Sequence, residues 1–360
     1  MQLEYAAILV SVVSILPMSS SHWWQFGAYV EKNYLEHGVF VPIQCDNMNL
    51  PTTQLSLCKD PRNERLMTHL GLAINLAVTA CNNSFNCSRW NCPYSGDRNL
   101  LGPLIGHGNR ETAVAHAITS AFAAYTITRD CAQQKLTGCG CDSTRRSDAS
   151  LATAASEVLA QHPNARLSWK GCSEDVEYGY SKSKEFVDAA EEETRQEKKL
   201  MNLHNNEAGR LAVKKELVLR CRCHGVSYAC NVQTCWYEMK HWKDVGEEIK
   251  SLYDKAVKVT VNAQSGKVEK ANGKEPGSEE MIYVNETQPD LCNLTKGRKC
   301  FRKGSSSECS CDVLCCQRGY NTVPKTIVKN CFCKLRMTPP PIRIVCNKCT
   351  KKIEEDYCRK

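Results

Sequence analysis

Apolar residues recur with a helical period along most of the chain before residue 220. The stretch 64–80 (ERLMTHLGLAINLAVTA) places four apolar residues four positions apart, which puts them on one face of a helix. The stretch 111–131 repeats this pattern and is rich in alanine, which allows close packing between helices. A longer charged stretch, 184–219, and a shorter one, 245–257, also have a helical period. These apolar stripes predict a helical core rather than ligand-binding sites.

The pattern changes twice after this helical part. Residues 221–236 form a short, cysteine-rich, turn-forming segment. Residues 262–278 are polar, rich in Gly, Lys and Glu, and lack a core-forming pattern, which is typical of a linker or mobile loop. From Cys292 onward the helical period disappears and cysteines follow every few residues. A segment this small buries little apolar area, so disulfides must stabilise it, and we predict a separate β-hairpin module.

The first apolar run, residues 5–16 (YAAILVSVVSIL), differs from the helical stripes. It has the length of a signal-peptide core and is followed by Pro17 and a group of serines, whereas nothing amphipathic surrounds it. We expect residues 1–21 to be a secretory signal peptide, although the preceding residues offer Glu4 and no Lys or Arg. No later segment reaches the ~18 apolar residues of a membrane span, so a soluble mature protein is expected.

Cysteine content is the most informative feature of the composition. The chain of 360 residues contains 24 cysteines, an even number, and 11 of them lie between Cys292 and Cys358. Such a density is typical of the oxidising secretory pathway, where cysteines pair as disulfides. The alternative is zinc binding, but zinc modules usually combine CxxC pairs with histidines. Only Cys346 and Cys349 have that spacing and the last histidine is His241, so we predict disulfides and no metal.

Charge and glycosylation signals fit the same compartment. The net charge of +8 indicates attraction to acidic surfaces, and without a nucleic-acid-binding motif we expect heparan sulfate rather than nucleic acid as the acidic partner. The basic residues near the C-terminus are either a solvated face or that glycan site: Lys296, Arg298, Lys299, Arg302, Lys303, Lys348, Lys351 and Lys352. N-glycosylation acceptor sequences begin at Asn82, Asn86, Asn285 and Asn293, of which Asn86 is weakened by the neighbouring Cys87.

The segment 221–236 (CRCHGVSYACNVQTCW) is the most specific feature of the sequence. Its four cysteines allow three connectivities. A hairpin favours the nested one, with Cys223–Cys230 inside Cys221–Cys235. The two pairs do not share one register, so a bulge or an irregular turn must offset the arms. The expected result is a rigid loop that is stapled twice.

This segment resembles the signature of the Wnt family, in which CxCHGxSGSC leads into a TCW ending. Further motifs of that family occur in order along the chain. They are RWNC at 89–92, ETA at 111–113 with CGCD at 139–142, GCSEDVEYG at 171–179, MNLHNNEAGR at 201–210 and LCCQRGYNT at 314–322. Ordered motifs spread over most of the chain make a chance match negligible.

Pattern and resemblance together predict an α+β protein with two domains. A helical N-terminal domain carries the disulfide-stapled, lipid-bearing hairpin, and a small cysteine-rich β-hairpin domain follows it. The expected boundaries are residues 1–21 for the signal peptide, 22–261 for the helical domain with its hairpin at 221–236, 262–290 for a linker and 291–360 for the C-terminal domain.

The resemblance implies a secreted lipid-modified morphogen rather than an enzyme. An acyltransferase of the endoplasmic reticulum would esterify Ser227 with palmitoleate, and an export carrier would deliver the ligand to the extracellular space and matrix. The lipidated loop and a C-terminal finger would then grip the cysteine-rich domain of Frizzled receptors, with low-density-lipoprotein-receptor-related or other co-receptors joining elsewhere. No cofactor is expected apart from the covalent acyl group. The expected receptor contacts are His224, Gly225, Val226, Ser227, Tyr228, Pro339, Pro340 and Pro341.

The sequence departs from the family pattern at both expected contact regions. Tyr228 and Ala229 stand where the family usually has Gly and Ser, and tyrosine disfavours the positive-φ turn that glycine permits. In the C-terminal finger, residues 339–341 are three prolines that replace the family's adjacent cysteines, and polyproline is stiff and apolar. Cys87 and Cys309 look additional, and one interpretation is a mutual bridge between the domains.

Two other function classes fit parts of the sequence. One is a matrix or decoy protein that is retained by glycans and never acylated. The other is a secreted serine hydrolase with Ser227 as nucleophile and His224 as base. The hydrolase reading lacks a GxSxG elbow and an assigned acid, and residues three apart in a tight loop give poor triad geometry.

Overall fold

The protein is described by a computed structural model, which covers residues 22–93, 107–144, 155–224, 230–286, 290–302, 309–336 and 343–360. The signal-peptide prediction for residues 1–21 therefore lies outside the described residues. The helices are α1 (Gln25–His37), α2 (Thr52–Lys59), α3 (Glu64–Ser84), α4 (Arg110–Ala132), α6 (Ser156–Gln161), α7 (Val176–Ala189), α8 (Gln196–Lys215), α9 (Trp242–Asp254) and α10 (Cys311–Leu314). The strands are β1 (Arg166–Trp169), β2 (Leu217–His224), β3 (Val232–Met239), β4 (Val257–Val261), β5 (Val268–Lys270), β6 (Ile282–Tyr283), β7 (Lys299–Cys300), β8 (Tyr320–Arg336) and β9 (Arg343–Cys358).

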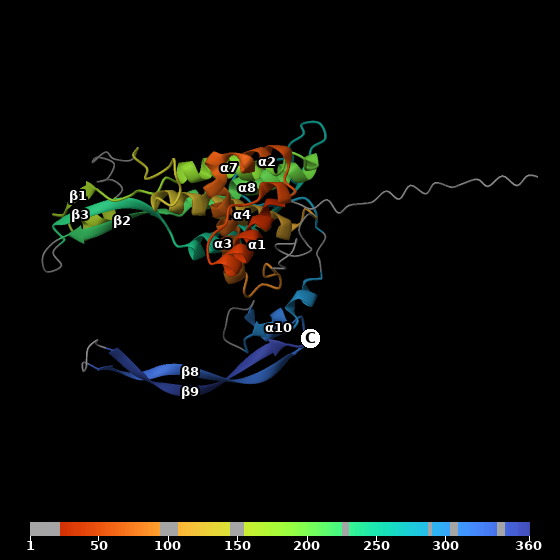
Figure 1. Cartoon of the computed structure of the whole chain (residues 1–360). Helices are drawn as coiled ribbons and strands as arrows, with labels where there is room; N and C mark the ends of the chain where they lie inside the picture. Colours follow the sequence, from red (N-terminus) through yellow and green to blue (C-terminus); the bar gives the residue numbers. More distant parts are fainter. Residues whose placement is uncertain are drawn as a thin grey trace, which may run out of the picture.

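Helix α4 is the centre of the helical domain. It packs against α3, α7, α8 and α9 (Figure 1), and nearly all of its side chains are buried. Its alanines let the neighbouring helices approach closely. Gly209 of α8 lies against the Ala117 carbonyl, where a Cβ atom would overlap that oxygen. The alanine-rich pattern at 111–131 therefore correctly predicts a buried helix with close neighbours.

The predicted helical stretch 184–219 is interrupted twice. Helix α7 ends at Ala189 and α8 begins only at Gln196, and the chain leaves the helix again to enter β2 at Leu217. The first break turns the chain so that Glu191 is buried beside His116 of α4. The second occurs because apolar and polar residues alternate over most of 217–224 and this segment pairs with β3 as a strand. The helical period of the preceding residues does not predict that pairing.

The segment expected to be a linker is partly ordered into a sheet. Strand β4 pairs with β5 on one side and with β6 on the other, in the order β5-β4-β6. Ile282 and Tyr283 of β6 are buried and belong to the helical core. The predicted linker is therefore ordered in part: residues 268–270 and 282–283 pair with β4, although 262–278 has no core-forming pattern.

The C-terminal module is a long two-stranded hairpin on a small disulfide-rich base. Strands β8 and β9 pair antiparallel from Tyr320–Cys358 outward, and β7 adds to β9 near the base. Its core consists of four cysteines and Leu314, which is too small to be stable without covalent links. Three disulfides supply those links: Cys292–Cys316, Cys300–Cys311 and Cys315–Cys358. The observed architecture confirms the predicted α+β fold.

Candidate functional site

The cysteine-rich segment forms a hairpin that projects from the helical domain. Strands β2 and β3 pair antiparallel without irregularity from Leu217–Met239 to His224–Val232, and β1 adds in parallel to β3 (Figure 1). Alternating residues of β3 are buried, including Gln233 and Cys235, which anchor the hairpin to the domain. The regular ladder makes the hairpin a straight arm.

Two nested disulfides staple this arm. Cys221 lies directly opposite Cys235 in the ladder and is bonded to it, with a Cα–Cα distance of 4.1 Å. Cys223 lies opposite Gln233 but is bonded to Cys230, beyond the end of β3. The register offset expected from the sequence therefore arises at the tip and not from a bulge between the paired strands. The second bridge holds the ends of the tip loop 4.8 Å apart.

The tip itself, residues 225–229, lies outside the described residues, and with it the expected contacts Gly225, Val226, Ser227 and Tyr228. His224 is the last residue before the tip. Its Nε2 atom is 2.7 Å from Oγ1 of Thr234, which fixes the imidazole against the opposite strand.

The base of the hairpin is held by one buried carboxylate. Glu174 accepts a 2.6 Å hydrogen bond from the backbone N–H of Met239 in β3, and a 2.7 Å bond from Arg129 of α4. Burial opposes the charge of Arg129, but its bond to Glu174 outweighs burial and raises the pKa of Arg129. Trp236 packs on Gly171, whose φ of +98° and lack of a side chain admit the ring. The arm is therefore fixed to the central helix.

The C-terminal finger has a similar construction. Cys331–Cys349 and Cys333–Cys346 bridge β8 and β9 in its outer half. The ladder shifts register between Cys331 and Lys334, so Cys331 is the last paired residue before the shift and Cys333 lies within it. The expected contact residues Pro339, Pro340 and Pro341 lie outside the described residues. Both hairpins extend toward the same side of the molecule, the left in Figure 1.

The two additional cysteines bond to each other. Cys87 follows α3 in the helical domain, Cys309 precedes α10 in the C-terminal module, and their Cα atoms are 4.5 Å apart. The interdomain interpretation is confirmed by this bridge. Every one of the 24 cysteines is in a disulfide, which leaves no thiolate to act as a zinc ligand.

The basic residues near the C-terminus separate into two groups. Arg298 is partly buried and donates to the carbonyl oxygens of Asn86, Ser88 and Arg89, so it joins the domains instead of offering a free charge. Lys299 and Arg302 pair with acidic residues of β9. In contrast, Lys296, Lys348, Lys351 and Lys352 are exposed, and Lys303 lies outside the described residues.

The four expected N-glycosylation sites differ in accessibility. Asn82 lies within α3 and is half-buried, and its side-chain amide donates to the Val78 carbonyl. Asn86, Asn285 and Asn293 are exposed. Glycosylation of the four stays a prediction.

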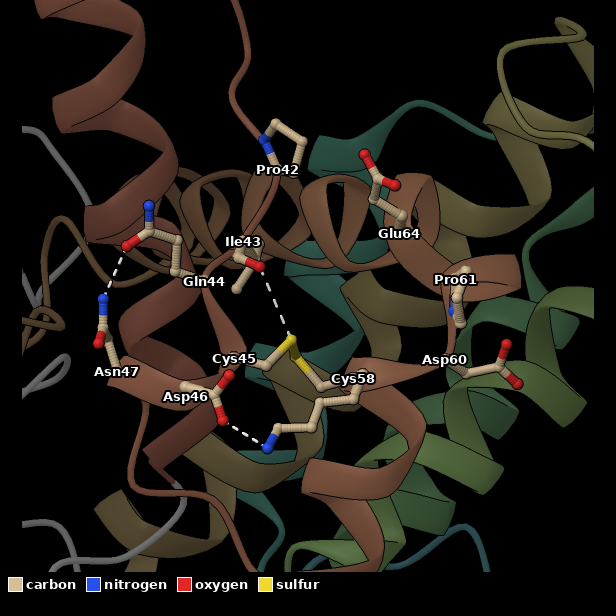
Figure 2. A pocket seen from close by; sticks show the side chains of 11 residues that line it. Pro42, Ile43, Gln44, Cys45, Asp46, Asn47, Cys58, Asp60, Pro61 and Glu64 are labelled. Carbon is tan, nitrogen blue, oxygen red and sulfur yellow. Dashed lines mark hydrogen bonds and ion pairs between the residues drawn. A yellow bond between two sulfur atoms is a disulfide. The ribbon is translucent and has the colours of Figure 1, made fainter.

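A pocket of 510 Å³ in the helical domain went unnoticed in the sequence. Residues 42–47, 58–61 and Glu64 line it around the Cys45–Cys58 disulfide (Figure 2). Asp46 pairs with Lys59 in its wall, and Asp60 pairs with Arg62 outside it. No functional residue that the sequence predicts lies in this pocket.

Comparison with known proteins agrees with the motif evidence. The family model described as the wnt family matches residues 46–359. Wnt-5b of Homo sapiens is 32% identical over 375 residues, which covers 99% of this chain and 99% of that protein. Wnt-2b-A of Xenopus laevis is 30% identical over 370 residues, covering 99% and 97% respectively.

A solved structure is also similar. It is human WLS in complex with WNT8A, for which the TM-score is 0.56 at 28% sequence identity, with 83% of this chain and 95% of that chain covered. Among the residues that the structure describes, no helix is both long and apolar enough to cross a membrane. The stapled hairpin, the ordered motifs and the family match across most of its length together show that this chain belongs to the Wnt family of secreted signalling ligands.

Proposed function

We propose that this chain is a secreted agonist of Frizzled receptors that carries palmitoleate as an ester on Ser227. The observation that supports this most is the hairpin arm, in which Cys223–Cys230 closes a short loop around Ser227 at the end of a regular ladder. Because two disulfides hold that loop before docking, little conformational entropy is lost when it binds.

The acyl chain would supply most of the binding free energy. A C16 chain buries about 14 methylenes at ~0.8 kcal/mol each, an upper bound near 11 kcal/mol before ordering costs. The hydroxyl of an unmodified serine offers about 1 kcal/mol for a hydrogen bond. A rigid arm with a lipid at its tip therefore suits insertion into an apolar groove on the receptor.

Signalling without catalysis is part of the proposal. A catalytic serine–histidine pair also needs an acid that orients the imidazole. The partner that lies 2.7 Å from Nε2 of His224 is the hydroxyl of Thr234 and not a carboxylate. The loop is better suited to present a covalent group than to perform hydrolysis.

Export and receptor grip complete the proposed function. The solved relative WNT8A is in complex with WLS, so we propose that WLS also exports this chain to the extracellular space and matrix, after acylation by a membrane-bound acyltransferase. The tip residues 224–228 would contact one side of the Frizzled cysteine-rich domain. The prolines 339–341 would contact the opposite side, and a low-density-lipoprotein-receptor-related co-receptor would bind elsewhere.

The first test compares Ser227→Ala with Ser168→Ala, a matched loss of a hydroxyl in the neighbouring strand β1. Mass spectrometry of the tip peptide should find a monounsaturated C16 acyl group in the wild type and in Ser168→Ala only. Affinity for a panel of Frizzled cysteine-rich domains should fall at least 100-fold in Ser227→Ala, since about 3 kcal/mol is a small part of the acyl contribution. An unmodified wild-type protein with full receptor activity would refute the lipid claim.

The second test replaces Pro339–Pro341 with Gly-Ser-Gly. We expect altered preference among the Frizzled domains, because the replacement removes a stiff apolar tip. Unchanged affinity for every domain of the panel would exclude a contact through these prolines while leaving the acyl loop unaffected.

A further inference from the structure

The outer half of the β8–β9 hairpin carries most of the excess positive charge of the chain. Residues 326–352 contain seven Lys or Arg and no Asp or Glu, in a chain whose net charge is +8. The acidic residues of the hairpin, 354–356, lie at its base, where Lys299, Arg302 and Lys325 pair with them. The base is therefore neutralised locally, and the outer half is not.

The basic side chains of this outer half are available to a partner. The six whose side chains the structure describes are all exposed, and none forms an ion pair with a described residue: Lys329, Lys334, Arg343, Lys348, Lys351 and Lys352. Lys348 donates only to the side-chain oxygen of Asn330. The hairpin thus presents cations along its length without a partner of opposite charge.

Apolar side chains are exposed between these cations. Leu335 and Ile344 lie directly opposite each other in the ladder, and their side chains are 57% and 71% exposed. Phe332 lies in the register shift with a φ of +47° and is 77% exposed. A positive φ is unusual for an aromatic residue. Exposed apolar clusters of this kind mark interaction surfaces in soluble proteins.

The combination identifies the chemistry of the partner. Cations alone would suit a sulfated glycan, but a polysaccharide is hydrophilic and offers no apolar phase for Phe332, Leu335 and Ile344. A bilayer with acidic headgroups satisfies both groups of side chains, because cations bind its surface and apolar side chains enter the headgroup boundary. We propose that the outer half of the β8–β9 hairpin is a membrane-interfacial element that binds acidic phospholipids.

The position of the hairpin adds a consequence that rests on the proposed acylation. A single acyl chain gives only marginal, reversible membrane binding, and stable attachment requires a second signal such as a basic patch. The lipid-bearing arm and the β8–β9 hairpin extend toward the same side (Figure 1). One membrane surface can therefore meet both, and the hairpin would retain the ligand there whenever the acyl chain is outside a receptor groove.

The experiment separates the lipid affinity of the hairpin from acylation by using full-length protein with Ser227→Ala throughout. Cosedimentation is measured with vesicles of phosphatidylcholine alone and of phosphatidylcholine mixed with phosphatidylserine. We expect binding to the mixed vesicles only, weakened by added salt. Adding K348Q, K351Q and K352Q should weaken it by roughly 100-fold, because each basic side chain near an acidic membrane contributes about five-fold.

A charge-matched control carries K170Q, K255Q and K274Q, all exposed lysines outside the C-terminal module, and should bind as the parent does. A second variant, L335S with I344S, keeps every charge and should lose about tenfold in vesicle binding with unchanged binding to heparin oligosaccharides. Equal vesicle binding by parent and both hairpin variants would overturn the proposal. A second pair of results would also overturn it: the lysine variant loses heparin binding and vesicle binding equally, and L335S with I344S loses neither. That outcome would indicate a glycan-binding site.

Discussion

Among single residues, His116 of α4 couples the stability of the core to pH. Its ring nitrogen is 3.4 Å from the Glu191 carboxylate, and both side chains are 2% exposed. Burial lowers the pKa of His116, although Glu191, Asp188 and a hydrogen bond with Asn206 act in the opposite direction. Below its ordinary pKa of about 6.5, the unfolded chain therefore takes up the proton more readily than the folded protein.

The resulting prediction is that the free energy of unfolding decreases as pH falls below about 6.5. The contribution of His116 to this slope is at most about 1.4 kcal/mol per pH unit, for one proton. His116→Gln should make the slope smaller in urea unfolding series with intact disulfides. His162→Gln, an exposed histidine, should leave it unchanged. Parallel curves for wild type and His116→Gln would assign the acid sensitivity to other groups.

At the scale of elements, the local period of apolar residues correctly predicted the long helices. It did not predict the elements that depend on contacts with residues distant in the sequence. The helices α3 and α4 match the predicted stretches closely, because their apolar faces are continuous. The break between α7 and α8 was missed because it is set by Glu191 entering the core beside α4, far away in sequence. The strands β5 and β6 were missed because they are only three and two residues long, too short to show a period, and are ordered through pairing with β4.

The same distinction between local and long-range information applies to the candidate site. Cysteine spacing was sufficient to predict the nested bridges of the arm, since a hairpin leaves few ways to pair them. The anchor of the arm was not predictable, because Glu174 and Arg129 belong to different elements and carry no local signal. In the sequence, the exposed apolar residues of the finger have the pattern of an ordinary strand. Only their exposure in the structure distinguishes them from core residues.

The anchor of the arm gives a prediction at this scale. Glu174→Gln removes the charge that binds Arg129 and weakens the acceptor for Met239 N–H. We expect a loss of about 2–3 kcal/mol in the free energy of unfolding, because the partly buried charge of Arg129 loses its shorter ion pair and the bond from Met239 N–H is weakened. Glu177→Gln is the matched control: it breaks an exposed pair with Lys214 and should cost less than about 1 kcal/mol. Urea unfolding followed by tryptophan fluorescence measures both, and equal losses would show that Glu174 is no special anchor.

For the whole molecule, the relative position of the two hairpins depends on a small contact between the domains. The proposed contact of both hairpins with one receptor domain requires that the distance between the arm and the finger match that domain. The Cys87–Cys309 bridge and Arg298 hold the same segment, residues 86–89, against the C-terminal module. The module is therefore fastened at one place by a covalent link and by the partly buried guanidinium of Arg298.

Because two contacts hold the same segment, we predict that removing both loosens the C-terminal module by more than the sum of the two single changes. Removing both cysteines together, Cys87→Ser with Cys309→Ser, leaves no free thiol, and Arg298 still binds the carbonyl groups of residues 86–89. Arg298→Met alone leaves the disulfide in place. We expect each change to raise hydrogen exchange in residues 290–302 only slightly, and the combination to raise it by far more than the sum, because groups that share one contact are coupled. Exchange in α4 should stay unchanged and serves as the internal control. Additive increases would mean that the two fastenings act independently, and the separation of the arm and the finger would then be set elsewhere in the chain.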